Sequence, residues 1–323
     1  MATDWGSLTT WEEARVRHRD GRVPICFGLA ATLYFHEGHT EEKRRASLEC
    51  FNEYERMCGS YLRWHSVSAN SRRMSSVGNL QSRDMSPYLL SPKWNEPEAR
   101  EHGWAFYWHG GEHPDDASPF KIHAYGSPKM YADLDNSLSF LQVSFPVLWF
   151  QGKLEDFPNL ILRWSERLKP YHGYGGITLL DSPDRGLSQK YSPNFAAYGN
   201  RYPGLEIDRP MSHKRATLEG IKGGNWLTIL STNFVDKLGG SYSFHSELGE
   251  LFAVQEYDGG VIVVAGAVPE VGDRNRNVDA PLYSRLAAVF KPIRIQRHPR
   301  PFSKGRFAQD GEYEAWLARF DEK

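Results

Sequence analysis

Two acids and a lysine are the residues of this sequence with the clearest capacity for catalysis. Asp208 precedes a Glu219-Gly220-Ile221-Lys222 run, and this order of acid, acid and lysine matches a pattern of metal-dependent nucleases. The carboxylates would hold a metal ion, and the ammonium group would stabilise charge that develops during the reaction. The pattern is common by chance, and a motif needs its structural context. We therefore keep a metal-dependent nuclease or hydrolase using Asp208, Glu219 and Lys222 only as an alternative to a protein without catalytic activity.

Two stretches of histidines and acids could supply metal ligands, but both are more typical of turns. The run His36-Glu37-Gly38-His39 follows a predicted strand, and its glycine favours a turn over a zinc-binding helix. The segment from His109 to Asp116 offers two histidines and three acids, but its Gly-Gly pair and its proline again favour a turn. We therefore predict no metal or cofactor. We interpret Glu112, Asp115 and Asp116 as an acidic turn suited to a basic partner.

A basic segment near the C-terminus could bind nucleic acid. The residues from Lys291 to Arg306 include six Lys or Arg and no acid, and a nucleic-acid module would place these cations on phosphates. The net charge of the whole chain is only -1, which favours a solvated surface segment instead. We therefore expect no direct nucleic-acid partner.

Two further stretches carry residues that suit protein recognition. Glu247, Glu250, Glu256 and Asp258 lie in a stretch without basic residues, which is typical of a solvated face. The segment 68–97 is rich in Ser, Arg, Asn and Pro and predicts a long loop, and such loops are usually functional or mobile. Its aromatic residues Tyr88 and Trp94 are candidate anchors, because Tyr and Trp are enriched among interface hot spots.

The composition is typical of a soluble globular protein, with 40% hydrophobic and 24% charged residues. The polar N-terminal segment 1–22 lacks the apolar core of a signal peptide, and no run of about 18 apolar residues predicts a membrane span. Cys26, Cys50 and Cys58 lack C-x-x-C spacing and fit reduced thiols in a cytoplasmic protein. The sequence also lacks a Gly-x-Ser-x-Gly elbow and a P-loop, so the usual turn of a hydrolase nucleophile and the usual phosphate loop are missing.

Hydrophobic periodicity predicts two strand–helix–strand units. The elements of the first unit are predicted over 23–35, 40–58 and 61–67, and those of the second over 138–150, 154–168 and 175–180. Thr40 is the expected N-cap of the first helix. The second helix carries the strongest amphipathic pattern in the chain. The units suggest a single domain over 23–323 with possible halves 23–135 and 136–323.

The remaining pattern favours an α+β fold with a mixed or mostly antiparallel sheet and flanking helices. Further strands are predicted over 103–108, 120–125, 226–230, 251–257, 260–265 and 293–295, and further helices over 187–198, 233–238, 282–290 and 313–320.

Five stretches match the pattern of a known family, in the expected order along the chain. They are Leu33-Tyr34-Phe35-His36-Glu37-Gly38-His39-Thr40, the run from Leu162 to Pro170, Tyr202-Pro203-Gly204-Leu205-Glu206-Ile207-Asp208, Ile221-Lys222-Gly223-Gly224-Asn225-Trp226-Leu227-Thr228-Ile229-Leu230, and Gly272-Asp273-Arg274-Asn275. From roughly Pro24 to Phe320 the chain resembles the bacterial type VI secretion immunity family. The family pattern has a larger apolar residue where this chain has Gly224.

The resemblance implies a cytoplasmic immunity protein that binds a toxin effector encoded by a neighbouring gene and that needs no catalysis of its own. Nucleases are prominent among the effectors of relatives, and inhibition would block the active site or substrate access. Acids on the immunity protein could then mimic phosphates and speed association. The partner-binding residues expected for this role are Glu112, Asp115, Asp116, Tyr88, Trp94, Glu247, Glu250, Glu256 and Asp258.

Overall fold

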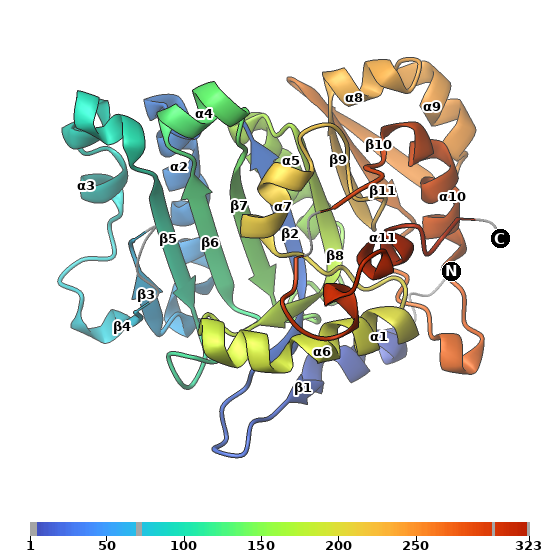
Figure 1. The fold of residues 1–323 in the computed structure, drawn as a ribbon, viewed down its shortest axis with the longest axis horizontal. Helices are drawn as coiled ribbons and strands as arrows, with labels where there is room; N and C mark the ends of the chain where they lie inside the picture. Colours follow the sequence, from blue (N-terminus) through green and yellow to red (C-terminus); the bar gives the residue numbers. More distant parts are fainter. Residues whose placement is uncertain (1–4, 69–72, 299–300, 322–323) are drawn as a thin grey trace.

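A computed structural model describes residues 5–68, 73–298 and 301–321. Within these residues eleven strands form one open sheet in the order β10-β11-β9-β8-β2-β7-β6-β5-β3-β4, with β1 paired to β2 (Figure 1). Every ladder between these strands is antiparallel. The predicted α+β fold with a mostly antiparallel sheet is therefore confirmed.

The elements have the following bounds. The strands are β1 (Arg15–Val16), β2 (Ile25–Phe35), β3 (Trp64–Ser66), β4 (Ser75–Ser76), β5 (Trp104–His109), β6 (Lys121–Gly126), β7 (Ser139–Phe145), β8 (His172–Asp181), β9 (Leu227–Ser231), β10 (Phe252–Tyr257) and β11 (Gly260–Ala265). The α-helices are α1 (Trp5–Glu13), α2 (Glu41–Cys58), α3 (Ser86–Leu89), α4 (Lys129–Asp135), α5 (Asp156–Leu168), α6 (Arg185–Arg201), α7 (Pro210–Ala216), α8 (Thr232–Lys237), α9 (Ser241–Leu248), α10 (Pro281–Phe290) and α11 (Glu312–Leu317). Short 3-10 helices include η3 (Pro92–Asn95) and η6 (Lys291–Ile293).

Strand β2 is the centre of the sheet, and every residue in it is buried. It pairs with β7 on one side and β8 on the other, so the two predicted strand–helix–strand units meet along it. Because side chains alternate along a strand, Leu29 and Leu33 point to one face while Thr32 and Tyr34 point to the other. The sheet therefore has one apolar face and one face that carries polar groups.

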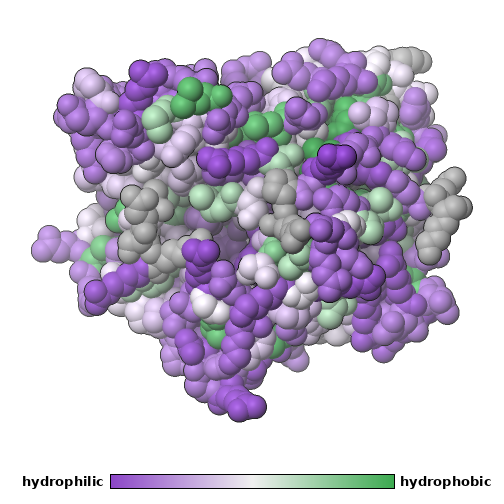
Figure 2. Space-filling model, viewed as in Figure 1, coloured by the Kyte–Doolittle hydropathy of each residue, from purple (hydrophilic) through white to green (hydrophobic). Residues whose placement is uncertain are grey.

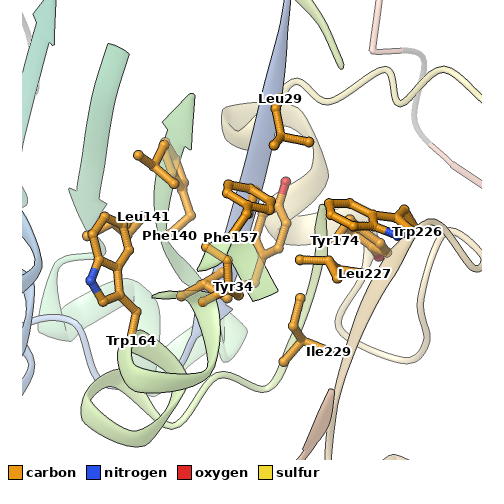
Figure 3. Packing of buried hydrophobic residues seen from close by; sticks show 14 of the residues in the cluster. Leu29, Tyr34, Phe140, Leu141, Phe157, Trp164, Tyr174, Trp226, Leu227 and Ile229 are labelled. Carbon is orange, nitrogen blue, oxygen red and sulfur yellow. The ribbon is translucent and has the colours of Figure 1, made fainter. Parts of the chain in front are cut away.

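Helices α2 and α5 cover the apolar face and pack against each other (Figure 1). Thr40 caps α2 as expected, since its hydroxyl accepts a hydrogen bond from the Lys43 N–H. In α5 the periodic apolar residues turn Phe157 and Trp164 inward, and the Phe157 ring stacks on Trp226 with centroids 5.9 Å apart (Figure 3). Glu53 of α2 accepts hydrogen bonds from α5, including one of 3.0 Å from the Trp164 indole N–H, which fixes the helices relative to each other.

The polar face lies under a second layer made from the C-terminal half of the chain. Helices α6, α7 and α11 lie in front of the sheet, with the irregular segments that join them (Figure 1). The N-terminal segment also takes part, because the Trp11 ring of α1 contacts Phe27 of β2 and Tyr202 edge-on. The layer encloses polar side chains that the sheet alone would leave exposed.

Some predicted elements differ from the structure for local reasons. The strand predicted over 138–150 ends at Phe145, because Pro146 cannot continue the ladder. The strand predicted over 293–295 is wrong: the chain forms η6 there and keeps only one bridge, between Ile221 and Arg294. The short helices α4, α7 and α9 were not predicted, because few turns give little periodic signal.

Replacing Phe157 by Ala should lower the free energy of unfolding by about 3–5 kcal/mol, because the substitution opens a cavity between α5 and Trp226. Leu162→Ala on the same helix should cost less than about 2 kcal/mol, since Leu162 is only partly buried. Urea unfolding followed by tryptophan fluorescence measures both. Equal losses in the two variants would contradict this packing.

Candidate functional site

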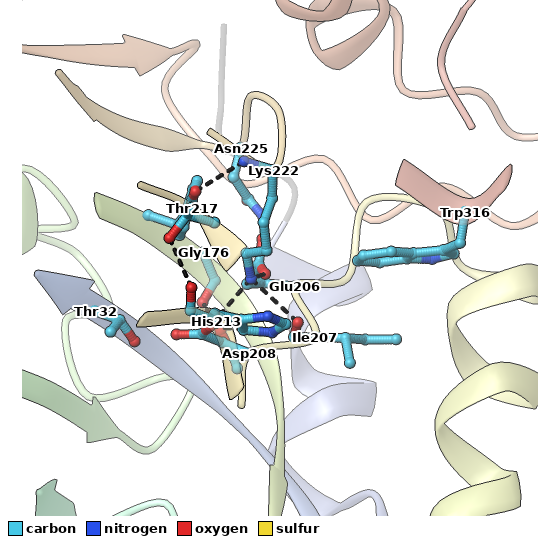
Figure 4. A network of polar contacts seen from close by, with 12 residues as sticks. Thr32, Gly176, Glu206, Ile207, Asp208, His213, Thr217, Lys222, Asn225 and Trp316 are labelled. Atoms are coloured by element: carbon cyan, nitrogen blue, oxygen red, sulfur yellow. Dashed lines mark hydrogen bonds and ion pairs between the residues drawn. The ribbon is translucent and has the colours of Figure 1, made fainter. Parts of the chain in front are cut away.

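Three of the sequence stretches that resemble the family converge on one buried ammonium group. Lys222 Nζ lies 2.5 Å from Glu206 Oε1 and 3.1 Å from Asp208 Oδ1, and it donates a third hydrogen bond of 3.2 Å to the Ile207 carbonyl (Figure 4). All three N–H groups of the ammonium are therefore satisfied. The side chains of Lys222, Glu206 and Asp208 are at most 7% exposed, so this site is closed to solvent.

The surrounding elements complete the hydrogen bonds of the two carboxylates. Asn225 donates to Glu206 Oε2 at 2.8 Å, and the Tyr34 hydroxyl of β2 donates to Asp208 Oδ1 at 2.7 Å. The Tyr174 ring of β8 lies 4.6 Å below the ammonium, and its hydroxyl accepts a hydrogen bond from the Lys222 backbone N–H. We refer to these six residues, Lys222, Glu206, Asp208, Asn225, Tyr34 and Tyr174, as the buried ion network.

Two further groups adjust the charge around the buried ion network. His213 of α7 lies 3.5 Å from Asp208, and burial together with the nearby Lys222 holds the pKa of His213 well below its usual value, so the ring is neutral. The Arg319 guanidinium stacks on Trp316 and is close enough to Glu206 for their charges to interact. A second cation thus accompanies the two carboxylates.

Glycines allow the strands and loops of the network to approach closely. A Cβ at Gly176 would fall 2.4 Å from the Asn225 side-chain oxygen. A Cβ at Gly224 would fall 2.5 Å from Leu286 Cβ, so the larger apolar residue of the family pattern would require α10 to shift here.

The structure brings together two of the three residues of the nuclease hypothesis and separates the third. Asp208 and Lys222 are in contact inside the protein, whereas the Glu219 side chain is exposed. No group of three His, Cys, Asp or Glu side chains suited to a metal occurs in the described part of the chain. The geometry of Asp208 and Lys222 is that of a satisfied structural ion pair, which orders the segments around it.

The predicted acidic turn joins β5 to β6, and its three acids have different environments. Asp116 is buried, and its carboxylate accepts hydrogen bonds from the backbone N–H groups of Val23 and His113. Asp115 is half-exposed and pairs with Arg22 at 3.0 Å. Glu112 is exposed at the tip. Asp116 therefore holds the turn, and Glu112 is the acid that it presents to solvent.

His109 fixes the same turn from below. Its Nε2 lies 3.1 Å from the Pro114 carbonyl, and its Nδ1 accepts a hydrogen bond from the Gly111 N–H. Burial lowers the pKa of His109 to about 4, so the ring is neutral at physiological pH.

Tyr88 and Trp94 lie in the predicted loop 68–97, of which residues 69–72 fall outside the described residues. Both aromatic rings are partly buried against the core rather than fully exposed. The Trp94 indole donates a hydrogen bond to the Tyr88 carbonyl, and Lys93 lies over both rings. The pair forms a small aromatic surface at α3 and η3.

The acidic stretch frames the sheet-edge strand β10. Glu247 and Glu250 precede the strand, Glu256 and Asp258 lie at its far end, and all four are exposed. Six residues of extended chain separate the two pairs by roughly 20 Å. Leu251 lies beside the first pair and is 66% exposed. Asp258 pairs with Lys169 at 2.5 Å.

The predicted partner-binding residues therefore occupy two regions rather than one. Tyr88, Trp94 and the acidic turn lie near β5, whereas the acidic stretch lies at β10, seven strands away across the sheet. Neighbouring strands are about 4.8 Å apart, which places the regions roughly 34 Å from each other. A single compact contact patch cannot contain both.

The basic segment 291–306 contributes to packing as well as to the surface. Arg294 is buried and forms a bidentate pair with Asp321, with both N–O distances 2.6 Å. Lys291 and Lys304 are exposed, and Arg306 pairs with Glu312. Residue 300, one of the six predicted cations, lies outside the described residues.

The model of the family described as "type VI immunity for VRR-NUC" matches residues 46–320. No curated protein matches the sequence significantly. Among solved structures, the Pseudomonas aeruginosa T6SS protein PA0821 has a similar fold, with a TM-score of 0.83 and 24% identity over 98% of this chain and 90% of that one. None of the described helices is both long and apolar enough to cross a membrane.

Replacing Lys222 by Met should lower the free energy of unfolding at pH 7 by about 3–5 kcal/mol, because it leaves Glu206 and Asp208 buried without their shared cation. Lys237→Met, at an exposed position of α8, should change stability by less than about 0.5 kcal/mol. Denaturant unfolding distinguishes the two. A Lys222→Met protein as stable as wild type would show that the network does not stabilise the fold.

Acidification should destabilise the protein through His109. Above pH 6.5 the ring is neutral in both states; as the pH falls from 6.5 to 4, the unfolded state binds a proton that the folded state excludes. Stability should fall by about 3 kcal/mol over this range from His109 alone. His109→Gln should weaken the protein at pH 7.5 but lose less on acidification, while the exposed His102→Gln should follow wild type. Parallel pH profiles for wild type and His109→Gln, from urea unfolding, would refute this role.

Proposed function

This chain belongs to the family of type VI immunity proteins for VRR-NUC, and we propose on that basis that it binds and neutralises a nuclease toxin. The family match over residues 46–320 is the observation that carries the proposal. Neutralisation is by occlusion: the bound protein covers the active site of the toxin or its path to substrate. The chain itself catalyses nothing in this mechanism.

The partner surface that we propose is the β10 edge, defined as Glu247, Glu250, Leu251, Glu256, Asp258 and the open side of the strand. A sheet-edge strand presents unpaired N–H and C=O groups that a partner strand can complete. Leu251 supplies an exposed apolar anchor beside two acids, which is the arrangement of an interface core with a polar rim.

Electrostatics support the same surface. A nuclease must bind a polyanionic substrate and therefore presents basic groups around its active site. The exposed acids Glu247 and Glu250 at the start of β10 would attract those groups, speed association and compete with phosphates, whereas Asp258 at its end already pairs with Lys169. Tyr88, Trp94 and Glu112 lie roughly 34 Å away across the sheet. They belong to this interface only if the toxin extends across the molecule.

The site of action that we propose is the cytoplasm. A nuclease toxin reaches its substrate there, so its inhibitor must be present in the same compartment. Cys26, Cys50 and Cys58 are buried free thiols, which suits a reducing compartment. The toxin gene is expected beside the gene for this chain.

Co-expression tests the proposal directly. The product of the neighbouring gene is expressed in a bacterium with and without this chain, and survival and co-purification are scored. Rescue together with a stable complex is the expected result. Killing in both strains with no complex would refute toxin neutralisation for that pair.

Charge reversal at Glu247 and Glu250, as E247K together with E250K, should slow association with the toxin about tenfold at low salt and less at high salt, because exposed charges are screened. E112K at the distant acidic turn is the matched control and should leave association unchanged. Stopped-flow or surface-binding kinetics at two salt concentrations measure both. A stronger effect of E112K would move the interface to the acidic turn.

A further inference from the structure

The polar face of the sheet contains a cleft that toxin binding does not explain. Its volume is about 420 Å³, and it opens over β5, β6 and β7 between α6, α7 and residues 301–303. Figure 2 shows this face of the molecule hollowed near its centre. The volume is within the range of small-molecule sites.

The floor of the cleft carries a buried lysine without a counter-ion. Lys121 of β6 is 4% exposed and lines the cleft. In the described part of the chain no carboxylate pairs with its ammonium, and Asp181 and Asp208 act on it only through their charges. Burial lowers the pKa of Lys121, while the charge of Asp181 acts in the opposite direction. Because Lys121 is nearly enclosed and borders the cleft, its ammonium has little access to water, and an anion in the cleft would satisfy its hydrogen bonds.

The other charged groups of the cleft leave it positive. Arg209 is already engaged, because it pairs with Asp181 at 2.8 Å and also contacts Ser188. Asp181 accepts a further hydrogen bond from Ser188, so this carboxylate is shared between them. Arg185 lies exposed at the rim. Lys121, Arg209 and Arg185 therefore face one lining carboxylate, that of Asp181. The charge of Asp208 also acts on Lys121, but Lys222 pairs with Asp208, so the cleft favours an anion.

The rest of the lining is suited to an organic molecule. Tyr107, Tyr125 and Phe302 contribute aromatic surface, and Gln142 and Ser212 contribute hydrogen-bonding groups. Gln142 also reaches Thr32 at 3.0 Å, and its amide lies 3.5 Å from Asp208, so the cleft floor adjoins the buried ion network. A ligand here would rest on a preorganised surface.

We propose that this cleft binds a small organic anion whose carboxylate or phosphate group accepts hydrogen bonds from the Lys121 ammonium, with an apolar or aromatic body against Tyr107, Tyr125 and Phe302. A small molecule fits better than a partner protein, because Lys121 is nearly enclosed and small ligands bury most of their surface in such sites. This site is independent of the β10 edge, which lies six strands away from β6.

Thermal unfolding with three probes tests the proposal: inorganic phosphate, adenosine monophosphate and 4-hydroxybenzoate, each against potassium chloride at equal ionic strength. At least one probe should raise the Tm of wild type by about 2 °C or more at about ten times its Kd. Lys121→Met should lose this response, while Lys190→Met, at an exposed position of α6, should keep it.

The stability of the variant without ligand separates a binding role from a structural one. Lys121→Met keeps the aliphatic stem and removes an unpaired charge, so its Tm should equal or exceed that of wild type. Lys121→Gln and isothermal titration calorimetry provide a second variant and a second readout. The proposal is overturned if no probe binds wild type at 10 mM, or if Lys121→Met binds as tightly as wild type. Suppose that no probe binds wild type and that Lys121→Met weakens binding of the toxin. Lys121 would then be assigned to a carboxylate of the toxin instead of a small anion.

Discussion

The burial of one ammonium group constrains much of this structure. Lys222 is inside the protein, and a charge there is tolerated only when its hydrogen bonds and its counter-charges are supplied together. Glu206 and Asp208 supply both, but only if their segment lies against β8, where Glu206 forms a bridge to Thr178. Tyr34 and Tyr174 then position the network on the sheet. The network thus fixes the segment 206–208 and the segment around Lys222 relative to strands β2 and β8.

The two faces of the sheet differ in chemistry, and each is covered by a different layer. Helices α2 and α5 cover the apolar face of the sheet, whereas the C-terminal layer covers the face that holds the buried ion network and the cleft above Lys121. Of the stretches by which the family is recognised, residues 203–208 and 225–230 lie inside, where they support the fold. The exposed acids lie at the sheet edge and in a turn, where their side chains are supported by the fold without being required for it. Recognition of a toxin can therefore use the periphery while the centre stays unchanged.

Periodicity predicted the strands and the amphipathic helices, because alternation and three-to-four spacing report which side chains face a core. It failed for residues 293–295, where the 3-10 helix η6 ends at Ile293 and Arg294 forms only an isolated bridge to Ile221. The burial of the charged residues in the buried ion network was harder to predict. Lys222, Glu206 and Asp208 look in sequence like solvated or catalytic groups, since their burial depends on a pairing across sixteen residues that no local pattern encodes. Asp116 was expected at the surface, but turn chemistry draws its carboxylate inward to two backbone N–H groups.

The most direct test of the account is a titration of toxin activity. The purified product of the neighbouring gene, which we propose to be a nuclease toxin, is held at a concentration far above the Kd of the complex, and DNA cleavage is measured as this chain is added. Inhibition by occlusion predicts that activity falls linearly and reaches zero at one molecule of this chain per toxin active site. Loss of activity at a small fraction of that amount would show that the chain acts catalytically on the toxin, and activity that persists beyond equivalence would show that it does not occlude the active site.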